Sequence, residues 1–255
     1  MRILLTSFLL IVSHVFCQDI IRQQIETSDG LSSDIVYQVF QDEDKFLWFS
    51  TELGVSKYNG FEFINYGFSD GLPDNSIYEI KETSNKVKWF LSGSGDLSYL
   101  KANSQKIHSE DSLSFDSFIS ELIELKNNRI VVSSFGGGVK IKDHNRYYHF
   151  TKENGLLSDF VSFIWERNNN VYLLSSKGIS RINEDYSIEV VFKFNEDIHF
   201  ARSCVINSNQ DVLFSSKKHI YYFGANDKIT QLKNSENIIQ KTVNKINLIE
   251  NRIAI

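Results

Sequence analysis

The chain has 255 residues, of which 42% are hydrophobic and 23% charged, so it is long enough to bury a sizeable core. Its net charge is −5 and the charges are interspersed, which argues against nucleic acid or an anionic membrane surface as a partner. The 20 Phe, 11 Tyr and 3 Trp residues, beside a single Pro and a single Met, favour β-strands.

The first 17 residues have the layout of a secretory signal peptide. Arg2 precedes an apolar run from Ile3 to Phe16, which is shorter than the roughly 20 residues that span a bilayer. We therefore expect residues 1–17 to be removed on export to the periplasm. The bulky Phe16 favours plain cleavage, with lipidation of Cys17 as the alternative. Cys204 is then the one remaining cysteine, and we expect it to be a small buried apolar residue.

From residue 28 onward the sequence repeats with a period of about 41 residues. Asp29 and Asp70 are 41 residues apart, and so are Trp48 and Trp89. Later units lose the Trp but keep the spacing in the segments 131–134, 172–175 and 213–216. A fixed period of this length is typical of repeat architectures. We place the repeats approximately at 28–68, 69–108, 109–152, 153–194, 195–235 and, in part, 236–255.

Within one repeat the local pattern is that of short antiparallel strands. Residues 35–40 alternate with period 2, a second strand centres on Trp48, and turns at Gly54 and Asn59-Gly60 lead to strands at 55–58 and 61–66. Four strands per 41 residues predict an all-β fold, a β-propeller of four-stranded blades, here five blades and part of a sixth. The expected structural positions of the repeat are Trp48, Trp89, Gly30, Gly71, Gly155, Gly54 and Gly60.

These residues resemble the two-component regulator propeller repeat. The resemblance rests on 46–51 (Phe-Leu-Trp-Phe-Ser-Thr), 54–60 (Gly-Val-Ser-Lys-Tyr-Asn-Gly), the Asp-Gly-Leu segments at 29–32 and 70–73, and the second unit at 89–99. It is specific over residues 22–108 and diffuse beyond. It implies a periplasmic sensor propeller that precedes a β-sandwich, a membrane helix and a histidine kinase. It also implies an environmental ligand, with oligosaccharides among the candidates, and homodimerisation as one signalling mode.

The sequence departs from the family pattern in three ways. Lys45 and Lys86 stand where the family has a glycine before Leu-Trp, and Trp is lost from the third unit onward. The chain also stops at Ile255, inside the expected sixth repeat, so we expect a fragment that lacks the membrane and kinase parts.

No residue pattern predicts catalysis, a metal or a cofactor. The histidines at 108, 144, 149, 199 and 219 show no recognised metal spacing, and Gly136–Gly138 fits a hairpin better than a phosphate loop. The expected ligand contacts are residues outside the repeat logic, namely Trp165 on a first strand and Arg146, Tyr147 and His149 on an outer strand. The functional prediction is a non-catalytic sensor segment. The alternatives are a secreted scaffold for protein or glycan binding and a propeller lyase.

Overall fold

The computed structural model describes residues 24–195, 203–207, 209–216, 219–232, 247–249 and 252–254. The expected leader at 1–17, with Cys17, lies outside them, as does most of the expected sixth repeat. In the described part, the only helical elements are the short 3-10 turns η1 (Thr27–Asp29), η2 (Phe68–Asp70), η3 (Lys152–Asn154) and η4 (Ala225–Asp227). The predicted all-β fold is confirmed.

Five four-stranded antiparallel sheets follow one another in the described residues, and we call them blades 1 to 5. Blade 1 holds β1 (Val36–Gln41), β2 (Leu47–Thr51), β3 (Gly54–Tyr58) and β4 (Phe63–Tyr66), and blade 2 holds β5 (Ile77–Glu82), β6 (Lys88–Ser92), β7 (Leu97–Leu100) and β8 (Ile107–Ser109). Blade 3 holds β9 (Ile119–Glu124), β10 (Ile130–Ser134), β11 (Val139–Asp143) and β12 (Arg146–Phe150). Blade 4 holds β13 (Val161–Arg167), β14 (Asn170–Ser175), β15 (Gly178–Ile182) and β16 (Ile188–Lys193). Blade 5 holds β17 (Ser203–Ile206), β18 (Val212–Ser215), β19 (Ile220–Phe223) and β20 (Ile229–Gln231), and β21 (Asn247–Ile249) pairs with β22 (Arg252–Ala254).

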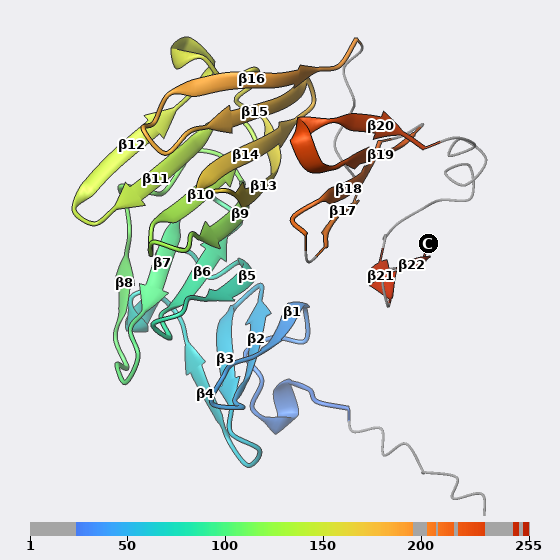
Figure 1. The fold of residues 1–255 in the computed structure, drawn as a ribbon. Coiled ribbons are helices and arrows are strands. Elements are labelled where there is room, and N and C mark those ends of the chain that lie inside the picture. Colours follow the sequence, from blue (N-terminus) through green and yellow to red (C-terminus); the bar gives the residue numbers. More distant parts are fainter. Residues whose placement is uncertain are drawn as a thin grey trace, which may run out of the picture.

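The blades lie in an arc around a central axis, as in a β-propeller (Figure 1). The first strand of each blade (β1, β5, β9, β13 and β17) is innermost, and the fourth is outermost. The Asp-Gly-Leu segments carry the chain from an outer strand to the next inner strand. Gly71 follows η2 with φ 104°, and a Cβ there would lie 2.6 Å from the carbonyl oxygen of Ile107, so this crossing requires glycine.

The apolar cores lie between blades. Trp48 of blade 1 is 2% exposed and packs with Ile80 and Phe90 of blade 2. Trp89 of blade 2 packs in the same way with Leu122 of blade 3. Two further cores join blades 3 to 4 and 4 to 5. Each sheet therefore buries its faces only by stacking against its neighbours.

The turn between the first and second strands contains a left-handed residue in each of the five blades. Its φ lies between 61° and 71°, at positions Lys45, Lys86, Asn128, Asn169 and Gln210, and in blade 4 the preceding Asn168 is left-handed too, at φ 51°. These positions recur every 41 or 42 residues and include the two lysines that replace the family's glycine. The turn geometry is therefore retained although the glycine that would adopt it without strain is absent.

We expect Lys45→Gly to stabilise the protein, because glycine relieves the left-handed strain at φ 71°. The free energy of unfolding should rise by about 0.5 to 1 kcal/mol. Urea denaturation followed by fluorescence measures this change. Lys45→Ala is the matched control, since it removes the same side chain and keeps the strain. Equal stability of the two variants would contradict the explanation.

A buried arginine joins blades 4 and 5. Arg167, 8% exposed, donates from Nε to the carbonyl of Gln210 at 3.1 Å and from Nη1 to that of Gly224 at 2.9 Å. Its guanidinium also lies 3.6 Å from the carboxylates of Asp211 and Asp227. This side chain satisfies blade 5 carbonyls and compensates two acids in one place.

Arg167→Ala should lower the free energy of unfolding by about 3 kcal/mol, because it leaves the buried carbonyls of Gln210 and Gly224 without their side-chain donor and Asp211 without its cation. Chemical denaturation of the full chain measures the loss. Arg146→Ala removes an exposed arginine whose side chain makes no hydrogen bond or ion pair with described residues, and it should change stability by less than about 0.5 kcal/mol. Similar losses in both variants would refute the inter-blade role of Arg167.

Candidate functional site

The inner strands begin at one face of the propeller, and four of them carry a β-bulge at the same place. The pairing register skips Tyr37 in β1, Tyr78 in β5, Ser120 in β9 and Ser162 in β13. A bulge leaves one residue out of the hydrogen-bonded ladder and re-aims its side chain. The fold thus places one such side chain per blade near the start of these four strands.

Aromatic side chains form a continuous row across this face. We define the aromatic row as Tyr37, Tyr78, Phe118, Phe135 and Phe160. Tyr37 stacks on Tyr78 with ring centroids 4.7 Å apart, and Tyr78 meets Phe118 edge-on at 4.8 Å. Phe118 stacks on Phe135 at 5.7 Å, and Phe135 pairs through its backbone with Phe160. The row therefore runs from blade 1 to blade 4.

The row is open to solvent. Tyr37 is 41% exposed, Tyr78 40% and Phe160 48%. Within the described part of the chain, the hydroxyls of Tyr37 and Tyr78 have no hydrogen-bond partner. Exposed aromatic rings gathered in one place mark interaction sites, and free hydroxyls add hydrogen-bonding capacity.

The loops around the row are acidic. We define the aromatic face as the row together with the segments before the inner strands (31–35, 72–76, 111–118 and 156–160) and the turns after the second strands (52–53, 93–96, 135–138 and 176–177). These segments hold one lysine, Lys177, and seven carboxylates: Asp34, Glu52, Asp74, Asp96, Asp111, Asp116 and Asp159. No ion pair between described residues involves any of the seven. Over blades 1 to 4 the described part of this face therefore carries an excess of negative charge, which Lys140 beside Asp116 offsets in part.

A hollow of 540 Å³ adjoins the row between blades 2 and 3. Phe115 and His149 line it, with their rings 6.0 Å apart, and the Nζ of Lys140 hydrogen-bonds to the carbonyl of Ser114 at its side. Burial lowers the pKa of Lys140, although the charge of Asp116 opposes this shift.

The structure places the four candidate ligand-binding residues from the sequence in different surroundings. His149 lines the hollow, and its Nε2 lies 2.7 Å from the carbonyl of Gly137. Tyr147 is 43% exposed on the outer strand β12 and donates to Glu110, and Arg146 is exposed on the same strand. Trp165 is 2% exposed and stacks on Tyr172 inside the core between blades 4 and 5. Of these four residues, His149 lines the hollow, Tyr147 and Arg146 lie elsewhere on the outer strand, and Trp165 is buried away from the surface.

Sequence reasoning did not single out Tyr78, Phe118 or Phe160. The available signal was their register, since Tyr37 and Tyr78 are 41 residues apart and Phe118 and Phe160 are 42 apart. Tyr37 and Tyr78 share one position of the repeat, and Phe118 and Phe160 share a position two residues earlier. No single position of the repeat is therefore aromatic in all four blades.

An ion cluster joins the inner strands of blades 2 and 3. The Nζ of Lys81 lies 3.0 Å from Glu79 and 2.8 Å from Glu121. Burial acts to lower the pKa of Lys81, but the charges of Glu121 and Glu79 outweigh it and the net shift is upward. Burial also raises the pKa of Glu121. On β17, burial raises the pKa of Cys204, which keeps this thiol protonated at neutral pH.

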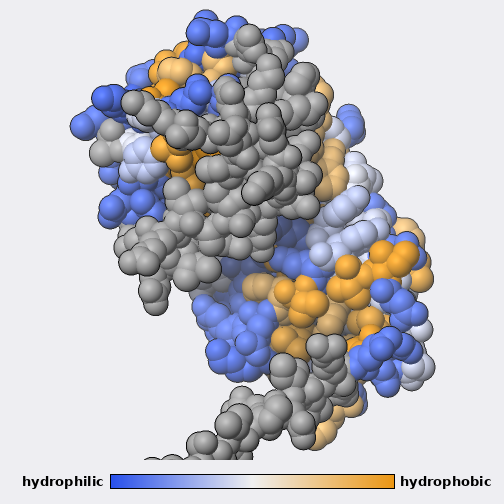
Figure 2. Space-filling model, turned by 90° about the vertical axis from the view of Figure 1, so that its right-hand side faces the viewer, coloured by the Kyte–Doolittle hydropathy of each residue, from blue (hydrophilic) through white to orange (hydrophobic). Residues whose placement is uncertain are grey.

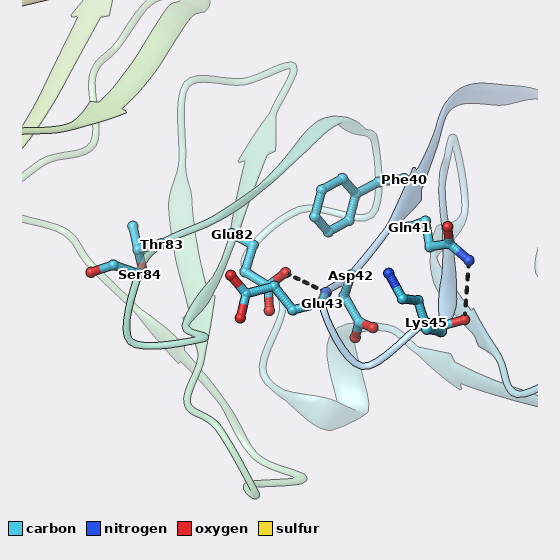
Figure 3. Close-up of a pocket in the computed structure, with 8 residues that line it drawn as sticks. All are labelled: Phe40, Gln41, Asp42, Glu43, Lys45, Glu82, Thr83 and Ser84. Carbon is cyan, nitrogen blue, oxygen red and sulfur yellow. Dashed lines mark hydrogen bonds between the residues drawn. The ribbon is translucent and has the colours of Figure 1, made fainter.

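The opposite ends of the inner strands carry a repeated contact between blades. We call Glu82, Glu124 and Glu166 the carboxylate latches, because each accepts a backbone N–H from the preceding blade. The donors are Glu43 to Glu82 at 3.1 Å, Ser84 to Glu124 at 2.6 Å and Lys126 to Glu166 at 3.2 Å. Figure 3 shows Glu82 reaching the turn of blade 1. It lines a 390 Å³ pocket with Phe40, Gln41, Asp42, Glu43, Lys45, Thr83 and Ser84.

Glu124→Ala should lower the free energy of unfolding by about 1 to 2 kcal/mol, because the carboxylate accepts both the N–H and the hydroxyl of Ser84. Thermal and urea denaturation of the full chain measure it. The control is Glu43→Ala, since only the backbone of Glu43 takes part in a latch. A loss of stability no larger than that of Glu43→Ala would contradict the latch.

In the described residues, no group of three or more His, Cys, Asp or Glu side chains is arranged to hold a metal. No helix among the described residues is long and apolar enough to cross a membrane.

Comparison with known proteins supports the repeat and the fold. Residues 30–52 match the model of the two-component regulator propeller family. Comparison with curated proteins gives no match. The extracellular domain of a protein described as a hybrid two-component system from Bacteroides thetaiotaomicron superposes with a TM-score of 0.65 at 21% identity, over 82% of this chain and 31% of that one.

Two further structures are similar in fold. The extracellular domain of a protein described as a one-component system, also from B. thetaiotaomicron, gives a TM-score of 0.64 at 16% identity, over 84% of this chain and 33% of that one. Virginiamycin B lyase from Staphylococcus aureus gives a TM-score of 0.62 at 16% identity, over 78% of this chain and 69% of the lyase. The chain thus spans about a third of the length of the two extracellular domains. At such identities the likeness concerns the fold. Residues 30–52 are a two-component regulator propeller repeat, and the chain that carries them is a β-propeller.

Proposed function

We propose that the chain is the ligand-recognising propeller segment of a periplasmic sensor for two-component signalling. The observation that carries the proposal is the aromatic row, because three of its rings are exposed on one face of a rigid scaffold. The repeat at 30–52 and the similarity to extracellular domains support the signalling context. The expected leader at 1–17 supports export.

The proposed ligand is an oligosaccharide that lies along the aromatic row. The carbon–hydrogen face of a sugar ring is apolar and stacks on an aromatic ring, whereas its hydroxyls need hydrogen-bond partners. The rings of Tyr37 and Tyr78 provide a surface for stacking, and their free hydroxyls and the nearby carboxylates provide hydrogen-bond partners. In this proposal the propeller binds without catalysis or a cofactor, and a membrane helix and kinase elsewhere in the receptor transmit the signal.

A thermal-shift screen of the full chain against neutral, cationic and acidic oligosaccharides tests the proposal. A ligand at ten times its Kd should add about 1.4 kcal/mol and raise Tm by roughly 3 to 5 °C. Tyr78→Ala should abolish the shift. Tyr147→Ala is the matched control, because it removes an equally exposed tyrosine from the outer strand β12 and should leave the shift intact.

Three results would contradict this function. No shift with any saccharide would remove ligand recognition and favour a secreted scaffold for protein partners. Equal loss in the Tyr78 and Tyr147 variants would place the site elsewhere. Product formation from a saccharide or a cyclic peptide, followed by mass spectrometry, would favour a propeller lyase.

A further inference from the structure

We infer that the aromatic face selects a positively charged oligosaccharide, a chain of amino sugars with free ammonium groups, and rejects acidic saccharides. The inference deepens the proposed function and rests on it for the saccharide part of the ligand. The charge selection comes from the carboxylates around the aromatic row.

The first step is the charge imbalance of the aromatic face. Seven carboxylates and one lysine lie in its segments, and none of the seven is in an ion pair within the described ranges. The opposite face differs, because Lys88 lies 2.9 Å from Glu82 and 3.3 Å from Asp42, and Lys86 lies 2.6 Å from Asp44. Charges of one sign that are not neutralised attract ligands of the opposite sign and repel those of the same sign.

The second step is that carboxylates and rings lie side by side. Asp74 accepts the N–H of Ser76 at 3.0 Å and that of Ser94 at 3.3 Å, which fixes its carboxylate between β5 and the turn after β6. The ring of Tyr78 lies against Gly93 in the same turn, and a Cβ at Gly93 would come within 2.7 Å of it. A cation at this place lies close to the carboxylate of Asp74, which attracts it, and to the exposed ring of Tyr78.

The third step is the shape of the surface. The aromatic row crosses blades 1 to 4, so it suits an elongated ligand with repeated flat units better than a single small cation. Beside the row, three carboxylates (Asp96, Asp111 and Asp116) and one ammonium group (Lys140) line the 540 Å³ hollow between blades 2 and 3, together with His149. A chain of amino sugars supplies a stacking ring and an ammonium group in every unit.

Binding of three hexasaccharides to the full chain, measured by calorimetry at low salt and pH 6, tests the inference. The probes are hexaglucosamine, its neutral N-acetylated form and hexagalacturonate. We expect hexaglucosamine to bind at least about tenfold more tightly than the neutral form, with no measurable binding of hexagalacturonate. Added NaCl should weaken the binding of hexaglucosamine and leave that of the neutral form unchanged.

The diagnostic variant combines Glu52→Gln, Asp111→Asn and Asp116→Asn, whose carboxylates make no hydrogen bond with described residues, so that folding is retained. It should weaken hexaglucosamine about tenfold and leave the neutral hexasaccharide unchanged. The matched control combines Glu43→Gln, Asp44→Asn and Glu184→Gln, three acids outside the aromatic face, and should change neither affinity.

The outcomes separate the two proposals. If hexagalacturonate binds as tightly as hexaglucosamine and Tyr78→Ala abolishes both, the charge selection is wrong and the sensor function stands. If hexalysine binds as tightly as hexaglucosamine and competes with it, the ligand is a basic peptide and the amino-sugar assignment is wrong. If none of the three hexasaccharides binds, both the inference and the saccharide-sensing function are overturned.

Discussion

The structure depends on stacking between blades. In the described part of the chain the large apolar cores are shared between blades, because Trp48, Trp89 and Trp165 each pack into a core shared with the following blade. The exposed surface shows what happens where this stacking is missing among the described residues. Val39 in β1 is 58% exposed, whereas Ile80, Leu122 and Ile164, at the same place in the next three blades, are at most 2% exposed. Figure 2 shows apolar surface gathered at the height of blade 1.

Polar groups complement the apolar stacking in a way that differs along the chain. Between blades 1 and 2, Trp48 donates its indole N–H to the buried Asp42 at 2.8 Å, and Lys88 compensates the charge. At the corresponding place in blade 2 the residue is Thr83, and the indole N–H of Trp89 is left without a partner. Between blades 4 and 5 the buried Arg167 provides the polar contact, because it donates to carbonyl oxygens of blade 5. The backbone arrangement is therefore repeated from blade to blade, while the buried polar contacts differ from one interface to the next.

The fold was predictable from the sequence because its signals are local and periodic. The 41-residue spacing of Trp48 and Trp89 and the hairpin signal at Asn59-Gly60 both reflect short-range chemistry that recurs in each blade. The left-handed backbone at Lys45 and Lys86 could not be predicted from the sequence, because lysine rarely adopts a positive φ and the expected glycine is absent.

The site was less predictable because it is assembled across blades. The aromatic row combines the bulge residues of β1 and β5 with rings that precede β9 and β13 or follow β10, and this combination is not encoded in one segment. Trp165 shows the converse difficulty, because a tryptophan outside the consensus position looks available in sequence but fills a core between blades. Tyr147 and His149 were correctly placed on an outer strand, where their surroundings depend on the neighbouring loops.

The bulge in the inner strands releases one side chain per strand from the pairing pattern, and these side chains serve different purposes. Tyr37 and Tyr78 are about 40% exposed, whereas the hydroxyl of Ser120 donates to the carbonyl of Val161 in the next blade and that of Ser162 to the carbonyl of Leu174. The chain carries Tyr, Tyr, Ser and Ser at these four positions. Blades 1 to 4 thus use the same backbone irregularity in two ways, to present an aromatic ring or to tie the inner strand to the structure around it.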